Sequence, residues 1–105
     1  MKLNTHGTCH QLANDQRIMT SYVNGVRSLQ LISDKGSCHE AAWQAVVIAL
    51  RAARMLGAKH IIISNSSRLV ANQFDGSWRA RNPMMRSLRN LCRRLADGMS
   101  VSFQF

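Results

Sequence analysis

The segment from Ser37 to Leu56 constrains the fold of this chain more than any other. At about 100° per residue its polar side chains fall within a stripe roughly 80° wide, and the remaining surface is apolar. These polar residues are Glu40, Gln44, Arg51 and Arg54. We expect such a helix to lie between a sheet on one side and further helices on another. Ser37 and Glu40 have capping-box spacing at its start, and Gly57 is placed to end it.

Strands are predicted on both sides of this helix. Before it, extended segments lie at Lys2–Thr5, Arg17–Val23 and Arg27–Ser33, and the Asn-Gly dipeptide at 24–25 is a signal for a hairpin turn. After it, Ala58–Ser64 contains three consecutive isoleucines, a pattern typical of a parallel strand covered on both faces. The order strand, long helix, strand predicts a right-handed crossover.

Capping and turn residues predict the rest of the chain. The predicted elements are a short helix from Ser66 or Ser67 through Phe74, a helix from Asn82 to Asp97-Gly98 with Pro83 in its first turn, and a half-buried strand over 101–105. The order is therefore β-β-β-α-β-α-α-β. This predicts an α/β fold, with a mixed five-stranded sheet flanked by helices.

Length and composition set the class of protein. The 105 residues are enough for one domain, so we expect residues 1–105 to form a single unit. With 46% apolar and 18% charged residues, the chain is too apolar for disorder and too often interrupted by charge to cross a bilayer. Its three cysteines are an odd number, and no secretory signal follows the first residue, so a cytoplasmic location without a membrane partner is expected.

Basic residues are concentrated in the second half of the chain. Residues 51–105 hold ten of the fourteen Lys and Arg but two of the five Asp and Glu, within a net charge of +9. Six arginines lie in sixteen residues without an acidic residue: Arg79, Arg81, Arg86, Arg89, Arg93 and Arg94. Trp78 precedes them in a polar loop, where an indole can stack on a base while guanidinium groups meet phosphates. This predicts a nucleic-acid partner; the alternative is a face that only keeps the protein soluble.

Two stretches resemble the ribonuclease H family. Residues Glu40–Leu50 are similar to the family's Asn-Glu-Ala-Glu-Tyr-x-Ala-Leu helix. Residues Leu69–Pro83 are similar to its Leu-Val-Val-Asn-Gln-Leu-Asn-Gly-x-Tyr-x-x-Lys-Asn-Pro stretch, at the separation that the family uses. The resemblance covers residues 37–105, whereas residues 1–36 match only in their pattern of strands. It implies a ribonuclease H-like fold.

The resemblance also implies where a cleavage site would lie. Members of that family cleave the RNA strand of RNA/DNA hybrids with about four acidic residues that hold two Mg²⁺ ions. In this chain these positions fall on His6, Glu40 and Ser66, and on a segment beyond Phe105, so that Glu40 is the one carboxylate retained. Because Mg²⁺ requires anionic oxygen ligands, we expect two-metal cleavage to be lost and no cofactor to be bound, with Mg or Mn needed if the site is active. A single weakly bound metal at Glu40 and His6 is the remaining metal hypothesis.

Each candidate residue also has a structural interpretation. Glu40 can serve only to close the capping box, and Trp43 is expected in the core rather than as a stacking platform. Ser66 and Ser67 are helix caps rather than nucleophiles, because no Asp-His relay can be traced to them. Cysteine and histidine residues could also form a zinc site, but they do not have the usual C-x-x-C or H-x-x-x-H spacing. We therefore expect each cysteine to be a free thiol. The candidate zinc ligands are His6, Cys9, His10, Cys38 and His39.

We therefore expect a catalytically inactive ribonuclease H-like domain that binds RNA, DNA or their hybrid through its arginine-rich loop and helix. The expected binding residues are Trp78, Arg79, Arg81, Arg86, Arg89 and Arg93. Two alternatives stay open. One is an active metal-dependent endonuclease with an unusual site formed by Glu40, His6 and Asn65. The other is a protein-interaction module or homodimer that uses Met84, Met85 or the edge of the final strand.

Overall fold

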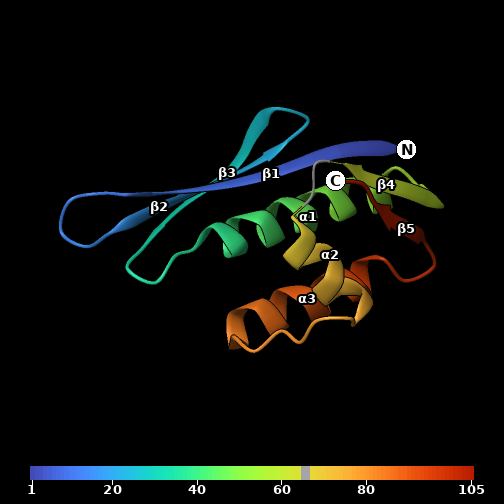
Figure 1. Ribbon diagram of the computed structural model, residues 1–105. Helices are drawn as coiled ribbons and strands as arrows, with labels where there is room; N and C mark the ends of the chain where they lie inside the picture. The colour runs from blue at the N-terminus through green and yellow to red at the C-terminus, as the bar shows by residue number, and fades with distance from the viewer. Residues whose placement is uncertain (65–66) are drawn as a thin grey trace.

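The computed structural model describes residues 1–64 and 67–105 and has one five-stranded sheet with three helices (Figure 1). The strands are β1 (Lys2–Gln11), β2 (Arg17–Val23), β3 (Val26–Ser33), β4 (His60–Ser64) and β5 (Ser100–Phe103). The helices are α1 (Cys38–Met55), α2 (Arg68–Asp75) and α3 (Pro83–Leu95). The strand order is β3-β2-β1-β4-β5; β1, β2 and β3 pair antiparallel, whereas β4 is parallel to both β1 and β5. The predicted α/β fold and order of elements are confirmed.

The first three strands form a meander whose turn was readable from the sequence. Asn24 and Gly25 both have left-handed backbone angles, with φ of 53° and 76°, which a tight two-residue hairpin turn requires. Strand β1 is longer than the predicted Lys2–Thr5 and runs to Gln11. Residues 6–11 have no alternation of apolar residues, but they pair with residues 17–22 of β2, and this pairing imposes the strand conformation.

Helix α1 lies between the sheet and helix α3, as its apolar surface predicted (Figure 1). The Ser37 hydroxyl accepts a hydrogen bond from the Glu40 amide at 3.2 Å, which caps the start of the helix. Gly57 follows its end with φ of 71°. Both predicted boundaries are therefore confirmed to within one residue.

All three helices lie on one side of the sheet, so β4 is not covered on both faces as predicted (Figure 1). Ile61 and Ile63 point into the core and are at most 1% exposed, whereas Ile62 is only partly buried. The sequence pattern was misleading because the three isoleucines alternate in direction along a strand. Sheet residues that point away from the helices thus form a second, helix-free face.

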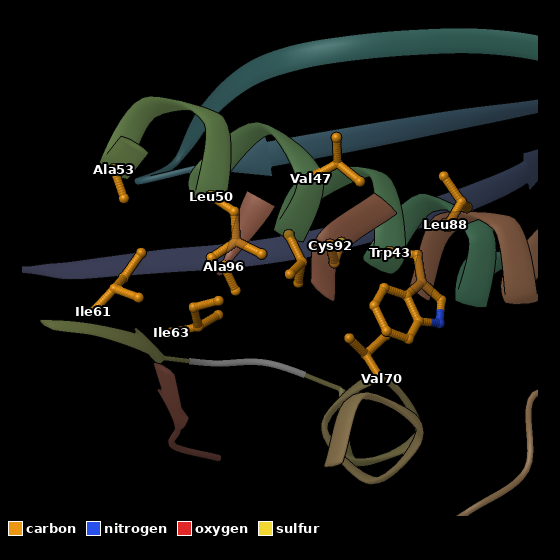
Figure 2. Packing of buried hydrophobic residues seen from close by; sticks show 11 residues of the cluster. Trp43, Val47, Leu50, Ala53, Ile61, Ile63, Val70, Leu88, Cys92 and Ala96 are labelled. Carbon is orange, nitrogen blue, oxygen red and sulfur yellow. The ribbon is translucent and has the colours of Figure 1, made fainter. Parts of the chain in front are cut away.

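The core gathers side chains from α1, β4, α2 and α3 (Figure 2). Trp43 is fully buried in it, as predicted, and its indole nitrogen donates a hydrogen bond to Gln73 Oε1 at 2.9 Å. Helix α3 begins at Pro83 with Asn82 as its cap, since the Asn82 side chain accepts from the Met84 amide. The helix ends at Leu95, two residues before the predicted stop, and β5 ends at Phe103.

Candidate functional site

A cavity of about 310 Å³ lies where β1 meets the first turns of α1 and the start of α2. At the edge of this cavity the β1 backbone approaches α1 closely at Gly7. A methyl group on Gly7 would lie 2.5 Å from the carbonyl carbon of Ala41 and 2.8 Å from Cα of Ala42, so only glycine fits. The cavity is lined by Thr5, His6, Gly7, Cys38, His39, Ala42 and Ser67.

Glu40 lines a different cavity from His6. The cavity of Glu40, about 230 Å³, lies between the β3–α1 turn and the first turn of α3 and includes Asn82, Met84 and Met85. The α1 residues that line the cavity of His6 are Cys38, His39 and Ala42, whereas Glu40, two positions before Ala42, points in a different direction. The structure therefore does not bring together the two residues assigned to a weak metal site.

His6 lies against an aromatic residue of the neighbouring strand. Its ring centroid is 6.1 Å from that of Tyr22, its register partner on β2. Both rings also border a cavity of about 380 Å³ with Asn4 and Thr8. His6 is exposed to solvent, and no carboxylate is found among the described residues that line the two cavities it borders.

Burial raises the pKa of the Glu40 carboxyl above its ordinary value of 4.5. Holding two Mg²⁺ ions would need several ionised oxygens, but the described lining of the His6 cavity supplies two imidazoles, two hydroxyls and a thiol. In residues 1–64 and 67–105, no group of three or more His, Cys, Asp or Glu is arranged to hold a metal ion. The residues present therefore do not fit a two-metal centre. Asn65 and Ser66, named as candidates from the sequence, lie outside the described residues.

The predicted arginines belong to the 76–82 loop and helix α3, which lie on the side of α1 away from the sheet (Figure 1). We call this group of residues the arginine surface; it consists of Arg79, Arg81, Arg86, Arg89, Arg93 and Arg94. The apolar side of α3 packs inward, where Leu88 and Cys92 are buried. Arg79, Arg81, Arg86 and Arg94 are exposed, and within the described part of the chain their guanidinium groups have no hydrogen-bond or ion-pair partner.

Two of these arginines bond to the protein itself. Arg93 donates to the carbonyl oxygens of Phe74, at 3.0 and 3.2 Å, and of Gln73, at 3.4 Å. These carbonyls belong to the last turn of α2, which has no intrahelical donor for them, so Arg93 ties α2 to α3. Arg89 bonds only to its neighbour Asn90. The sequence pattern grouped Arg93 with the others and gave no sign of this structural role.

Trp78 stands beside the arginine surface in an ordered loop. The loop begins at Gly76, whose φ of 92° ends α2. The Ser77 amide donates to Asp75 Oδ1 at 2.8 Å, and the Trp78 amide donates to the Asn72 carbonyl at 3.0 Å. With its backbone fixed in this way, the Trp78 side chain is 49% exposed. The loop therefore presents a large aromatic ring to solvent at a defined position.

Solved structures with the same arrangement of elements define the class of this protein. Ribonuclease H1 from the halophilic archaeon Halobacterium salinarum NRC-1 superposes with a TM-score of 0.65 at 20% sequence identity, over 100% of this chain and 84% of that one. The N-terminal ribonuclease H domain of Rv2228c from Mycobacterium tuberculosis, fused to maltose binding protein, gives 0.69 at 17%, over 100% and 86%. The fold is thus that of the ribonuclease H-like superfamily.

A third structure, LC11-RNase H1 in complex with an RNA/DNA hybrid, gives a TM-score of 0.67 at 14% identity, over 99% of this chain and 83% of that one. The family model described as reverse transcriptase-like matches residues 9–105. The chain belongs to this family. A search of curated proteins finds no match. None of the described helices is long and apolar enough to cross a membrane.

Proposed function

We propose that this ribonuclease H-like domain binds nucleic acid through the arginine surface and does not cleave it. The observation that carries the proposal is the set of four exposed arginines whose guanidinium groups have no hydrogen-bond or ion-pair partner in residues 1–64 and 67–105: Arg79, Arg81, Arg86 and Arg94. Cations without neutralising partners in one loop and the helix that follows it repel one another, and a polyanion removes that repulsion while releasing its own counterions. Trp78 beside them supplies a surface on which a base can stack.

The likeness to LC11-RNase H1, which was solved with an RNA/DNA hybrid, supports the hybrid as one ligand to test. Binding through phosphates does not read base sequence, so single-stranded RNA, single-stranded DNA and hybrid of several sequences should all bind. With four phosphates neutralised, the logarithm of the binding constant should fall with the logarithm of salt concentration with a slope of about −3.6.

The proposed loss of cleavage rests on the donor set around His6. The cavity holds no carboxylate among its described residues, and Glu40, the acid retained in the sequence pattern, lies in another cavity with a raised pKa caused by burial. Neutral imidazole and hydroxyl ligands do not offset the repulsion between two Mg²⁺ ions.

Fluorescence anisotropy with a labelled hybrid across a salt series tests binding. In the test variant, Arg79, Arg81, Arg86 and Arg94 are changed to Gln; in the matched control, four exposed basic residues elsewhere are changed to Gln: Arg27, Lys35, Arg51 and Lys59. Both variants lose the same charge. We expect the test variant to bind at least about tenfold more weakly with a salt slope closer to zero by about 3 to 4, and the control to change little. Equal losses in both variants would show that net charge, rather than this surface, binds.

The same labelled hybrid with Mg²⁺ or Mn²⁺ tests cleavage. We expect intact strands after prolonged incubation with the unaltered protein. Cleavage that disappears in Glu40→Gln would contradict the proposed inactivity, while leaving the binding result to be judged by the variants above.

A further inference from the structure

Two cysteines that are far apart in sequence meet where β1 packs on the start of α1. Cys9 follows Gly7 by two residues and so points to the same side of the sheet, toward α1. Cys38, the first residue of α1, lies one turn before Ala41 and Ala42, which the Gly7 backbone contacts. Helix α1 runs antiparallel to β1, so the step from Gly7 to Cys9 and the step back from Ala41 to Cys38 lead in the same direction. The two thiols therefore lie near each other, close enough for Cys38 to raise the pKa of Cys9.

The surroundings of the three cysteines differ sharply. Cys38 is exposed at the helix start, Cys9 is partly buried, and Cys92 is fully buried in the core. Burial raises the pKa of the Cys92 thiol to about 12, so it stays protonated and inert. Burial also raises the pKa of Cys9, as do the nearby Cys38 thiol and the charge of Glu40, whereas Arg17 lowers it. Cys38 is therefore the thiol that reagents in solution reach first.

We propose that Cys9 and Cys38 are an oxidation site, at which a small-molecule disulfide such as oxidised glutathione forms a reversible cross-link between β1 and α1. The Cys38 thiolate attacks one sulfur of the reagent, giving a mixed disulfide and one free glutathione thiol. The Cys9 thiolate then attacks the Cys38 sulfur and expels the second glutathione. In total the protein gives up two protons and two electrons, and the reagent is reduced to two thiols.

The cross-link would join β1, at Cys9, to the first residue of α1, Cys38. It closes a loop that contains β2 and β3, so it restricts the unfolded chain and should raise the unfolding temperature. Cys38 also lines the cavity that contains His6. Oxidation would therefore change the lining of this cavity and not the arginine surface. The inference is independent of the proposed function.

Thiol titration under denaturing conditions tests it, after the full chain is equilibrated with oxidised and reduced glutathione. The reduced protein has three titratable thiols, and we expect one after oxidation, a mass lower by about 2 Da, and a cross-linked Cys9–Cys38 peptide after digestion. The unfolding temperature should rise, and dithiothreitol should reverse all of these changes. Three remaining thiols, or a glutathione adduct on Cys38 without a cross-link, would overturn the proposal.

Two variants give matched controls. Cys92→Ser removes the inert thiol and should still lose both remaining thiols to the cross-link. Cys38→Ser changes an exposed residue, so the chain should fold, and it should show no rise in unfolding temperature on oxidation. A cross-link that persists in Cys38→Ser, through Cys92 or between two chains, would contradict the assignment.

Discussion

The two sides of helix α1 differ from the outer layer of the molecule in how their polar groups are paired. Toward the sheet, the buried Ser21 hydroxyl donates to the Ala41 carbonyl at 2.7 Å. Toward the other helices, the Trp43 indole is paired with Gln73. On the outer surface of α3, by contrast, the guanidinium groups of Arg86 and Arg94 have no hydrogen-bond or ion-pair partner among the described residues. An unpaired polar group is costly only when buried, so the interior must satisfy its groups while the surface can keep cations free for a ligand.

The largest effect is expected where β1 meets α1. Gly7→Ala would place a methyl group against helix backbone that cannot move aside, so we expect a loss of about 3 kcal/mol in the free energy of unfolding. Gly57→Ala is the control, because it has open space and only a left-handed φ to strain, and it should cost about 1 kcal/mol. Urea unfolding followed by circular dichroism measures both. Equal losses would mean that β1 and α1 are not in close contact.

The hydrogen bond between buried Trp43 and Gln73 allows the pairing of polar groups in the interior to be tested. Gln73→Leu leaves the indole N–H without an acceptor in the core and should cost about 2 kcal/mol. When Trp43→Phe is already present, the same change should cost about 1 kcal/mol less, because the donor is gone. Urea unfolding of the two single variants and the double variant gives this coupling. Strictly additive losses would argue against the hydrogen bond.

Variants of Arg93 and Arg86 compare an arginine that bonds to the protein with one that has no partner among the described residues. Arg93→Ala removes the donors to the Phe74 carbonyl and should lower stability by about 1 kcal/mol. Arg86→Ala removes no hydrogen bond or ion pair with the described residues and should leave stability within about 0.5 kcal/mol while weakening hybrid binding. Thermal unfolding and anisotropy on the same samples distinguish them. If both variants lose the same stability, Arg93 does not join α2 to α3.

The smallest effect concerns pH. Burial raises the pKa of Glu40 in the folded state, so the protonated carboxyl favours folding. This contribution is lost as pH rises from the ordinary value of 4.5 through the raised pKa of the folded state. Glu40→Gln does not ionise, so its stability relative to the unaltered protein should increase between pH 4 and pH 7. For Asp75→Asn, stability relative to the unaltered protein should instead decrease as pH rises toward 4, because hydrogen bonds from Ser77 lower the pKa of Asp75 in the folded state. A pH-independent difference for Glu40→Gln would show that Glu40 is solvated as in the unfolded chain.

Local signals carried the prediction of most elements. The cap at Ser37, the turn at 24–25 and Pro83 each act within a few residues, and the structure has all three. The length of β1 could not be predicted in this way, because pairing with β2 decides it. The glycine after His6 was an available signal for close backbone approach within a strand, and it would have pointed to the contact with α1.

The candidate site was less predictable than the fold. Glu40 and Ala42 are two positions apart in the sequence, and which of them faces His6 depends on how α1 is rotated against β1. That rotation is fixed by packing at Gly7 and Trp43, which involves residues distant along the chain. The arginine surface was predictable in composition, but the division between Arg93 and its free neighbours was not.

The sequence by itself determined the order of elements, the caps of the helices, and the excess of positive charge near the arginine surface, because periodicity, turn chemistry and charge are properties of neighbouring residues. Only the tertiary structure decided that Glu40 and His6 lie apart, that Cys9 meets Cys38, and that Arg93 bonds to α2. Each of these three findings depends on how segments distant in the sequence pack against one another, and such packing depends on the shape of the whole core.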